Sequence, residues 1–96
     1  MANYVLLINW TEQGVRTFRE TLDRADAFSK QAEQMRARVK DLSWTLGAYD
    51  IVATVEAPDD ETMTALALGV SAGGNIRTTT LRAFNRDEMS QIVSRA

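Results

Sequence analysis

The sequence predicts a small α+β fold in which two β-α-β units share one sheet, and three observations lead to it. Residues 3–10 and 49–56 are short runs rich in β-branched and aromatic side chains, which favour strands. Residues 15–35 place apolar side chains every three or four positions, the period of an amphipathic helix. Pro58, followed directly by acidic residues, indicates that a strand ends there and a second helix begins.

The first half of the chain predicts a strand, a helix and a hairpin. Thr11 follows the strand at 3–10 and can cap a first helical turn, although Gly14 weakens that turn. The helical stripe after it is interrupted near residues 21–23 and comprises Val15, Phe18, Leu22, Ala25, Phe28, Ala32 and Met35. After residue 35 the apolar period changes to two, so residues 38–56 predict a β-hairpin that turns at Gly47 and Ala48.

The second half predicts a helix, a strand and a short terminal helix. Asp59 can cap the helix that follows Pro58, and the Gly73-Gly74 pair ends it. Residues 75–84 form a threonine-rich strand. Residues 85–88, "NRDE", resemble a capping box in front of a last helix.

The predicted order is therefore β-α-β-β-α-β plus a tail helix, the ferredoxin-like arrangement, in one domain spanning residues 1–96. In this topology the first and third strands are central, and both are apolar on both faces. The two helices cover one face only. We expect a second copy of the sheet to cover the other face, which predicts a homodimer or higher oligomer, with Trp10, Trp44 or Tyr49 as anchors. Partial exposure, or cover by the tail helix, would be the simpler alternatives.

Composition excludes several classes of function. Eleven basic and thirteen acidic residues give a net charge of −2, which is of the wrong sign for a nucleic-acid partner. The first ten residues contain no basic leader and only a short apolar run, so we expect neither a signal peptide nor a membrane partner, and a cytoplasmic location. Without histidine or cysteine, any catalysis must use carboxylates, tyrosines or arginines.

No metal site and no cofactor are predicted. The acidic residues 59–61 are explained by the start of a helix. Gly69, Gly73 and Gly74 lie towards the end of that helix, where carbonyl groups rather than amides face outward, and no lysine follows them. They therefore do not form a phosphate-binding loop.

The best candidate site is the turn that contains Gly47, Tyr49 and Asp50. Gly47 supplies a permissive backbone, Tyr49 an aromatic wall, and Asp50 a carboxylate at the edge of an apolar strand. Such a carboxylate could accept a proton or hold a ligand amine. It could equally bond to turn amides or pair with an arginine, which is the commoner use of an aspartate next to a glycine.

A second candidate group lies on the last strand. Thr78, Thr80 and Arg82 alternate along it and share one face, where hydroxyls and a guanidinium could bind a carboxylate ligand. A solvated or interface face explains the same three residues.

The stretch from residue 44 to residue 84 resembles the GYD-domain family of dimeric α/β barrels, because Gly47, Tyr49 and Asp50 match its glycine and tyrosine-aspartate motif. The turn is also similar to that in the effector-binding domains of leucine-responsive regulators, although this chain has no helix-turn-helix. The family resemblance carries little chemistry, and our first hypothesis is a homo-oligomeric module that binds or senses a small molecule near the Gly47 to Asp50 turn or between facing sheets. A cofactor-independent enzyme related to monooxygenases or dehydratases, with Asp50 or Tyr49 handling the proton, and a purely structural subunit are the alternatives.

Overall fold

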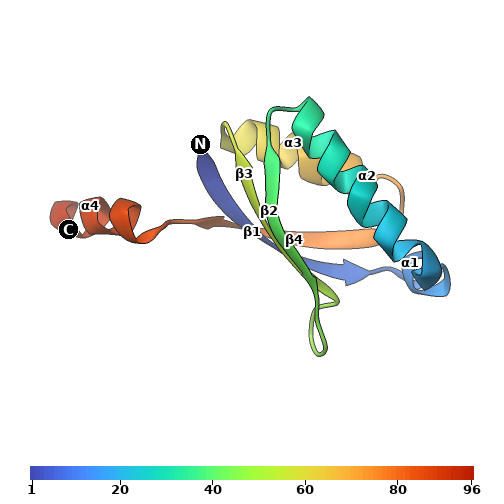
Figure 1. Cartoon of the computed structure of the whole chain (residues 1–96). Helices are drawn as coiled ribbons and strands as arrows, with labels where there is room; N and C mark the ends of the chain where they lie inside the picture. The colour runs from blue at the N-terminus through green and yellow to red at the C-terminus, as the bar shows by residue number, and fades with distance from the viewer.

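A computed structural model describes residues 1–96 and places the strands and helices in the predicted order (Figure 1). The elements are β1 (Ala2–Trp10), α1 (Glu12–Arg16), the 3-10 turn η1 (Phe18–Glu20), α2 (Thr21–Gln34), β2 (Arg38–Trp44), β3 (Ile51–Ala57), α3 (Asp60–Ser71), β4 (Ile76–Ala83) and α4 (Arg86–Arg95). The sheet order is β2-β3-β1-β4, and every neighbouring pair is antiparallel. This confirms the ferredoxin-like α+β fold with β1 and β3 at the centre.

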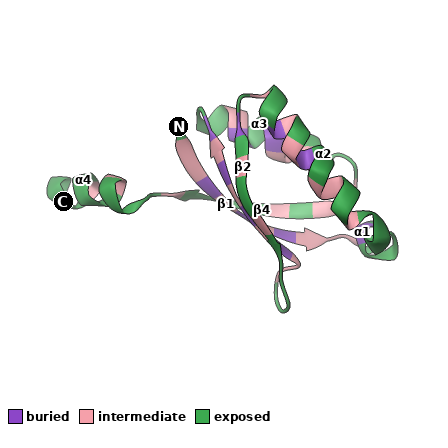
Figure 2. Cartoon of the chain, viewed as in Figure 1, coloured by how far each residue is buried: buried purple, intermediate pink, exposed green.

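The register of the sheet separates a helix-covered face from an open face. Leu6 of β1 lies between Ala53 of β3 and Thr80 of β4, whereas its neighbour Leu7 lies between Val52 and Thr79. Because side chains alternate along a strand, the Leu6 row faces α2 and α3 and the Leu7 row faces away from them. Figure 2 shows the buried positions gathered between the sheet and the two helices.

The core is therefore a single layer between sheet and helices. Twelve apolar residues are buried in it: Tyr4, Leu6, Ile8, Phe28, Ala32, Ala37, Ile51, Ala53, Val55, Ala57, Met63 and Leu66. Both helices lie on the same side of the sheet, as two right-handed crossovers require (Figure 1). At ~25 cal/mol per Å² of buried apolar surface, this layer is the main source of stability.

The first helix differs from its prediction at the break. The interruption lies at residues 17–20, before the predicted 21–23, because α1 ends at its C-cap Thr17 and η1 follows. Thr11 caps α1 as expected, its hydroxyl accepting the Gly14 amide at 3.1 Å. Gly14 is buried, and a Cβ there would lie 1.9 Å from the Asn75 carbonyl oxygen. This close approach fixes α1 against the start of β4.

The loop of the hairpin is longer than predicted. β2 ends at Trp44 and β3 begins at Ile51, so residues 45–50 form a loop where we expected a tight turn at Gly47 and Ala48. The Thr45 amide donates to the Asp50 carbonyl at 2.8 Å and closes the loop. A bulge between Val39 and Asp41 also shifts the alternation that the sequence pattern assumed to be regular.

The terminal helix α4 extends away from the body of the molecule (Figure 1). Its capping box is confirmed, because Asn85 and Glu88 each accept the other's backbone amide. Met89 and Val93, four residues apart, remain exposed on it. None of the helices has the length and hydropathy that crossing a membrane requires.

Candidate functional site

Asp50 lies directly before β3 and connects it to the end of β1. Its Oδ2 accepts the Trp10 amide at 2.9 Å, and its own amide donates to the Ile8 carbonyl at 2.9 Å. These contacts extend the β1–β3 pairing past the last residues of the ladder. The carboxylate thus caps an otherwise unpaired amide, a structural use that is fully explained without a ligand.

The other two residues of the loop motif lie nearer the hairpin tip. Gly47 has a φ of 126°, a left-handed conformation that favours glycine, and nothing lies within 4 Å of the position of a Cβ there. Tyr49 is half-buried, and its carbonyl accepts the Thr45 hydroxyl at 2.6 Å. The motif therefore determines the shape of the loop.

Thr78, Thr80 and Arg82 share one face of β4, as the sequence predicted, and that face is on the helix side of the sheet. They lie opposite Ile8, Leu6 and Tyr4 respectively. Thr80 and Arg82 are exposed at the sheet edge, while Thr78 is half-buried. Of the six predicted residues, only Thr78 lines the apolar cavity between the helices and the sheet, whereas Thr78 and Thr80 both line a second, larger and more polar hollow between α3 and β4.

Arg82 connects the sheet to α4. Its guanidinium carbon lies 4.5 Å from the centre of the Phe84 ring and 5.7 Å from that of Tyr4, and Nη2 is 3.6 Å from Glu88. The Asn85 amide, and then the charge of Arg82, hold the pKa of Glu88 below its usual value. Arg82 therefore already has partners within the chain, namely the Tyr4 and Phe84 rings and the Glu88 carboxylate.

Tyr4 is a buried tyrosine with an acidic partner. Its hydroxyl donates to Asp60 Oδ1 at 2.5 Å and ties β1 to the first turn of α3. Burial, and then this hydrogen bond, raise the pKa of Tyr4 to about 12. At neutral pH the phenol is protonated, so Tyr4 is a hydrogen-bond donor to Asp60.

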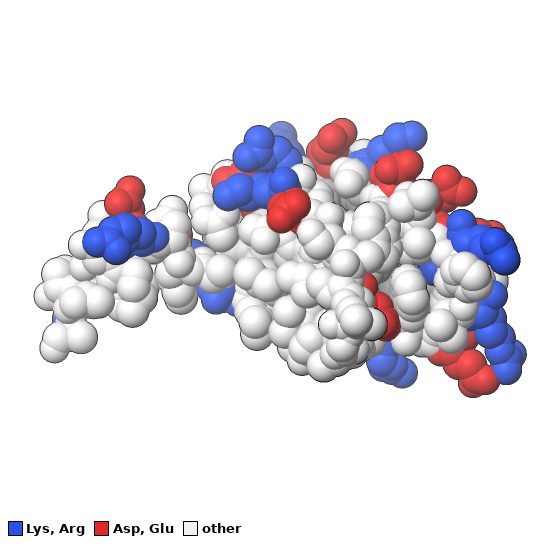
Figure 3. All heavy atoms as spheres, turned by 60° about the horizontal axis from the view of Figure 1, so that its bottom comes forward, with Lys and Arg blue, Asp and Glu red and all other residues white.

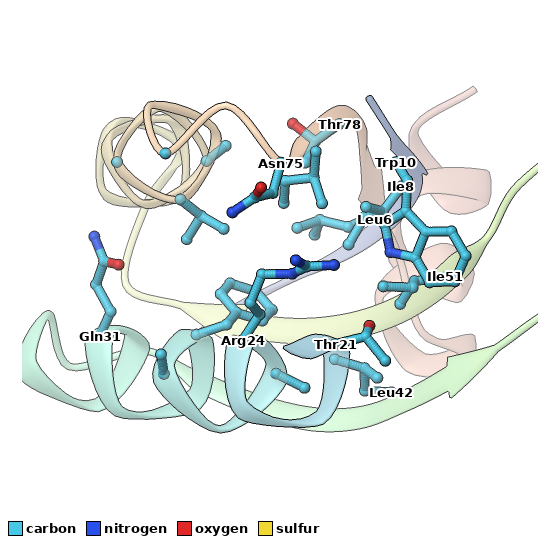
Figure 4. Close-up of a pocket in the computed structure, with 18 residues that line it drawn as sticks. Leu6, Ile8, Trp10, Thr21, Arg24, Gln31, Leu42, Ile51, Asn75 and Thr78 are labelled. Atoms are coloured by element: carbon cyan, nitrogen blue, oxygen red, sulfur yellow. The ribbon is translucent and has the colours of Figure 1, made fainter. Parts of the chain in front are cut away.

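A cavity of about 190 Å³ lies between α2, α3 and the sheet (Figure 4). Most of its lining is apolar and includes Leu6, Ile8, Phe28, Ile51, Val70 and Ile76. Small residues on the two helices leave the space open: Ala25 and Ala27 on α2, Ala67 and Gly69 on α3. Sequence reasoning missed this cavity, because the small residues on α2 and α3 are at least 40 positions apart and only the packing of α2 near α3 makes them neighbours.

The face of the sheet opposite the helices is uncovered. Val5, Leu7, Val52 and Leu81 lie at its middle by register, and Leu81 is 46 % exposed. Figure 3 shows the molecule from this side, with uncharged atoms over most of the centre and charged side chains mainly along the borders. An apolar centre with a charged rim is the pattern of a protein interface.

Two of the three predicted anchors of that face, Trp10 and Trp44, do not lie on it, and the third, Tyr49, lies in the loop outside the sheet. Trp10 lies opposite Ile76, and Trp44 lies opposite Ile51, so both tryptophans belong to the helix-side rows. Trp44 Nε1 donates to Thr21 Oγ1 of α2 at 3.0 Å. Alternation along each strand places Trp10 in the same row as Ile8 and Trp44 in the same row as Leu42, and both rows face the helices.

The sequence profile of the GYD domain matches residues 4–93. The chain belongs to the GYD-domain family. A curated relative is the glutamine synthetase and cystathionine beta-lyase binding protein of Thermus thermophilus, which is 30 % identical over 85 residues, 88 % of this chain and 90 % of the relative.

Solved structures share the fold of this chain. TTHA0845 of Thermus thermophilus superposes with a TM-score of 0.57 at 24 % identity, over 88 % of this chain and 95 % of that one. MtbAldR gives a TM-score of 0.64 at 19 % identity, and the leucine response regulatory protein LrpA of Mycobacterium tuberculosis gives 0.59 at 14 %. The match covers 88 % of this chain but 54 % and 51 % of these two proteins, so this GYD domain spans about half their length. At these identities the likeness concerns the fold.

Proposed function

We propose that this GYD-domain protein is a homodimeric binding module. Two copies pack their open sheet faces together, and each copy holds a small molecule in its helix-side cavity. The observation that carries the proposal is the uncovered apolar centre formed by Val5, Leu7, Val52 and Leu81. A folded domain of this size rarely leaves the apolar middle of a sheet in water, because covering it with an identical face removes both faces from solvent.

The size of the face supports a contribution from α4. Four strands spaced ~4.8 Å apart, each about seven residues long at ~3.4 Å per residue, project over roughly 450 Å². Stable interfaces bury about 800 Å² per partner, so the sheet alone provides only part of a typical interface. We propose that α4 packs against the second copy and supplies the rest of the buried interface area. A helix of 10 residues is marginal in isolation, and its Met89 and Val93 side chains are exposed in the single chain.

The enzymatic alternative has less support. A general base needs an available carboxylate close to a substrate, whereas one oxygen of Asp50 accepts the Trp10 amide. Asp50 also lies outside the lining of the cavity. We therefore favour binding over proton transfer at this residue.

The name of the Thermus relative supports a second, protein-binding role. That relative is named for binding glutamine synthetase and cystathionine beta-lyase. In the present chain Phe18 and Leu22, one turn apart, are 48 % and 63 % exposed and provide an apolar surface outside the sheet face. Co-elution with the glutamine synthetase of the same organism would support this role, and loss of co-elution in Leu22→Glu would locate it.

A cytoplasmic location remains our prediction.

Native mass spectrometry of the gently purified protein tests the proposed function, because it reports subunit number and retained ligand together. We expect a dimer or a multiple of it. A species that remains monomeric up to the highest protein concentration contradicts the sheet-on-sheet arrangement. A small retained mass that scales with subunit number supports the small-molecule part.

A further inference from the structure

We infer that the helix-side cavity binds a small monocarboxylate with a branched or aromatic apolar body. The inference rests on the small-molecule part of the proposed function and is independent of its dimeric part, because the cavity lies on the helix side of the sheet, opposite the open face. The size of the cavity, its unpaired hydrogen-bond donors and its charge each restrict the ligand.

The cavity accommodates a compact apolar group. Its volume is about 190 Å³, and an apolar cavity of ~150 Å³ is enough to bind benzene. Leu6, Phe28 and Val70 contact this space from the sheet, α2 and α3 respectively. The available room corresponds to a ligand of about six to nine non-hydrogen atoms, by the same comparison.

Trp10 points an unpaired donor into this region. Its Nε1 is buried and has no hydrogen-bond partner in the folded chain. In Figure 4 the indole nitrogen lies on the side of the ring that faces Arg24. A buried N–H group without an acceptor destabilises the folded chain, so an acceptor on the ligand would remove that destabilisation. An indole N–H can only donate, which requires an oxygen or another acceptor on the ligand.

Arg24 supplies the charge. Its side chain is 21 % exposed and extends from α2 into the space between the helix and Trp10 (Figure 4). Nη1 donates to the carbonyl and the hydroxyl of Thr17 at 3.1 and 2.9 Å, and Nη2 donates to the Gly14 carbonyl at 3.1 Å. A guanidinium has five N–H groups. These three contacts hold the side chain in place and leave two donors free.

The charge of Arg24 is poorly balanced within the chain. Its one acidic neighbour is Glu20, at 3.9 Å, beyond hydrogen-bond distance and 66 % exposed. No aspartate or glutamate is among the residues that line the cavity. A carboxylate on the ligand would meet Arg24 and Trp10 together, in the arrangement of a charge-assisted hydrogen bond. An ammonium group would instead be desolvated beside a cation, so amines are disfavoured.

Three probes with the same apolar body test this ligand class: 3-methylbutanoate, 3-methylbutanol and 3-methylbutylamine at pH 7. The readout is the ¹H–¹⁵N NMR signal of the indole N–H groups, of which the chain has two, from Trp10 and Trp44. Trp44→Phe assigns them. We expect the carboxylate to shift the Trp10 signal downfield in a saturable way, and the alcohol and the amine to bind at least tenfold more weakly.

Two variants and one control complete the test. Arg24→Gln should weaken carboxylate binding at least tenfold, whereas Arg16→Gln, which removes an exposed arginine paired with Glu12, should leave it unchanged. Because Arg24 also bonds to the backbone, Val70→Phe provides an independent test. It should fill the cavity, keep the fold and abolish the shift.

Equal affinity for all three probes, or no shift of Trp10 with the carboxylate, overturns the inference. Unchanged binding in a folded Val70→Phe variant also overturns it. Failure of dimerisation has a different signature: a monomeric Leu7→Glu variant should still bind the carboxylate, since Leu7 lies on the opposite face of the sheet from the cavity.

Discussion

Gly14 should be the glycine of this chain that is least tolerant of a methyl group. An alanine Cβ at this position would lie 1.9 Å from the oxygen and 2.9 Å from the carbon of the Asn75 carbonyl. Both atoms belong to the backbone, so no side-chain rotation relieves the contact. Gly14→Ala must therefore move α1 away from the start of β4.

The cost of this movement follows from the contacts it breaks. The Asn75 carbonyl accepts the Thr11 amide at 3.0 Å, and the Thr11 hydroxyl donates to the Gly74 carbonyl at 2.5 Å. Each such bond contributes about 0.5–1.5 kcal/mol, and overpacking adds about 1–3 kcal/mol. The higher helix propensity of alanine returns up to ~1 kcal/mol. The net loss of unfolding free energy should be about 1–5 kcal/mol with a midpoint of ~3 kcal/mol, or on the order of 10 °C in Tm.

Gly69→Ala is the matched control, because Gly69 is also a helical glycine. Its new Cβ would meet the amide nitrogen of Gln31 at 2.6 Å, and that group is the end of a flexible side chain. We expect this variant to be neutral or up to ~1 kcal/mol more stable. Urea denaturation at one fixed protein concentration compares the two. Equal stability of Gly14→Ala and the parent protein would refute the close contact between α1 and Asn75.

Three further predictions concern individual hydrogen bonds. Because the pKa of Tyr4 is raised to about 12, its protonated phenol contributes stability that is complete below about pH 10 and lost as pH rises towards 12. The urea midpoint of Tyr4→Phe should therefore change less over this pH range than that of the parent protein. Parallel pH profiles of the two proteins would contradict the assignment. Asn85→Ala removes the cap of α4 at a cost of about 1 kcal/mol, and hydrogen exchange should quicken in α4 while the rate in β1 stays unchanged. Asp50→Asn keeps an acceptor for the Trp10 amide and should lower the free energy of unfolding by less than ~1 kcal/mol. Asp50→Ala leaves that amide unpaired and should lower it by about 1–3 kcal/mol. Equal losses in the two variants would show that the hydrogen bond is unimportant.

The sequence predicted the elements well where local chemistry determines them. The caps at Asp59 and Asn85 form as expected, with Asp59 accepting the Thr62 amide at 2.8 Å. The central place of β1 and β3 followed from their apolar runs. However, odd-numbered and even-numbered residues of a strand face opposite sides of the sheet, and a one-residue bulge exchanges the two sides for all residues that follow it. The bulge after Val39 therefore could not be anticipated from alternation.

The candidate site was harder to predict. The motif of Gly47, Tyr49 and Asp50 was visible because turn chemistry is local, and the structure gives each of these residues a role in the loop. The cavity depends on contacts between distant segments. In the sequence, Arg24 of α2 appears as an ordinary surface arginine, and Trp10 at the end of β1 was predicted as an anchor of the open sheet face. Their juxtaposition is a property of tertiary packing alone.

Sedimentation velocity of Leu7→Glu beside Leu68→Glu tests the central claim, the pairing of open sheet faces, most directly. Both variants make the same chemical change. Leu7 lies at the middle of the open sheet face, whereas Leu68 is 68 % exposed on α3. We predict that Leu7→Glu sediments as a monomer and that Leu68→Glu sediments as the parent dimer. A dimeric Leu7→Glu protein, or a parent protein that is itself monomeric, would contradict the account.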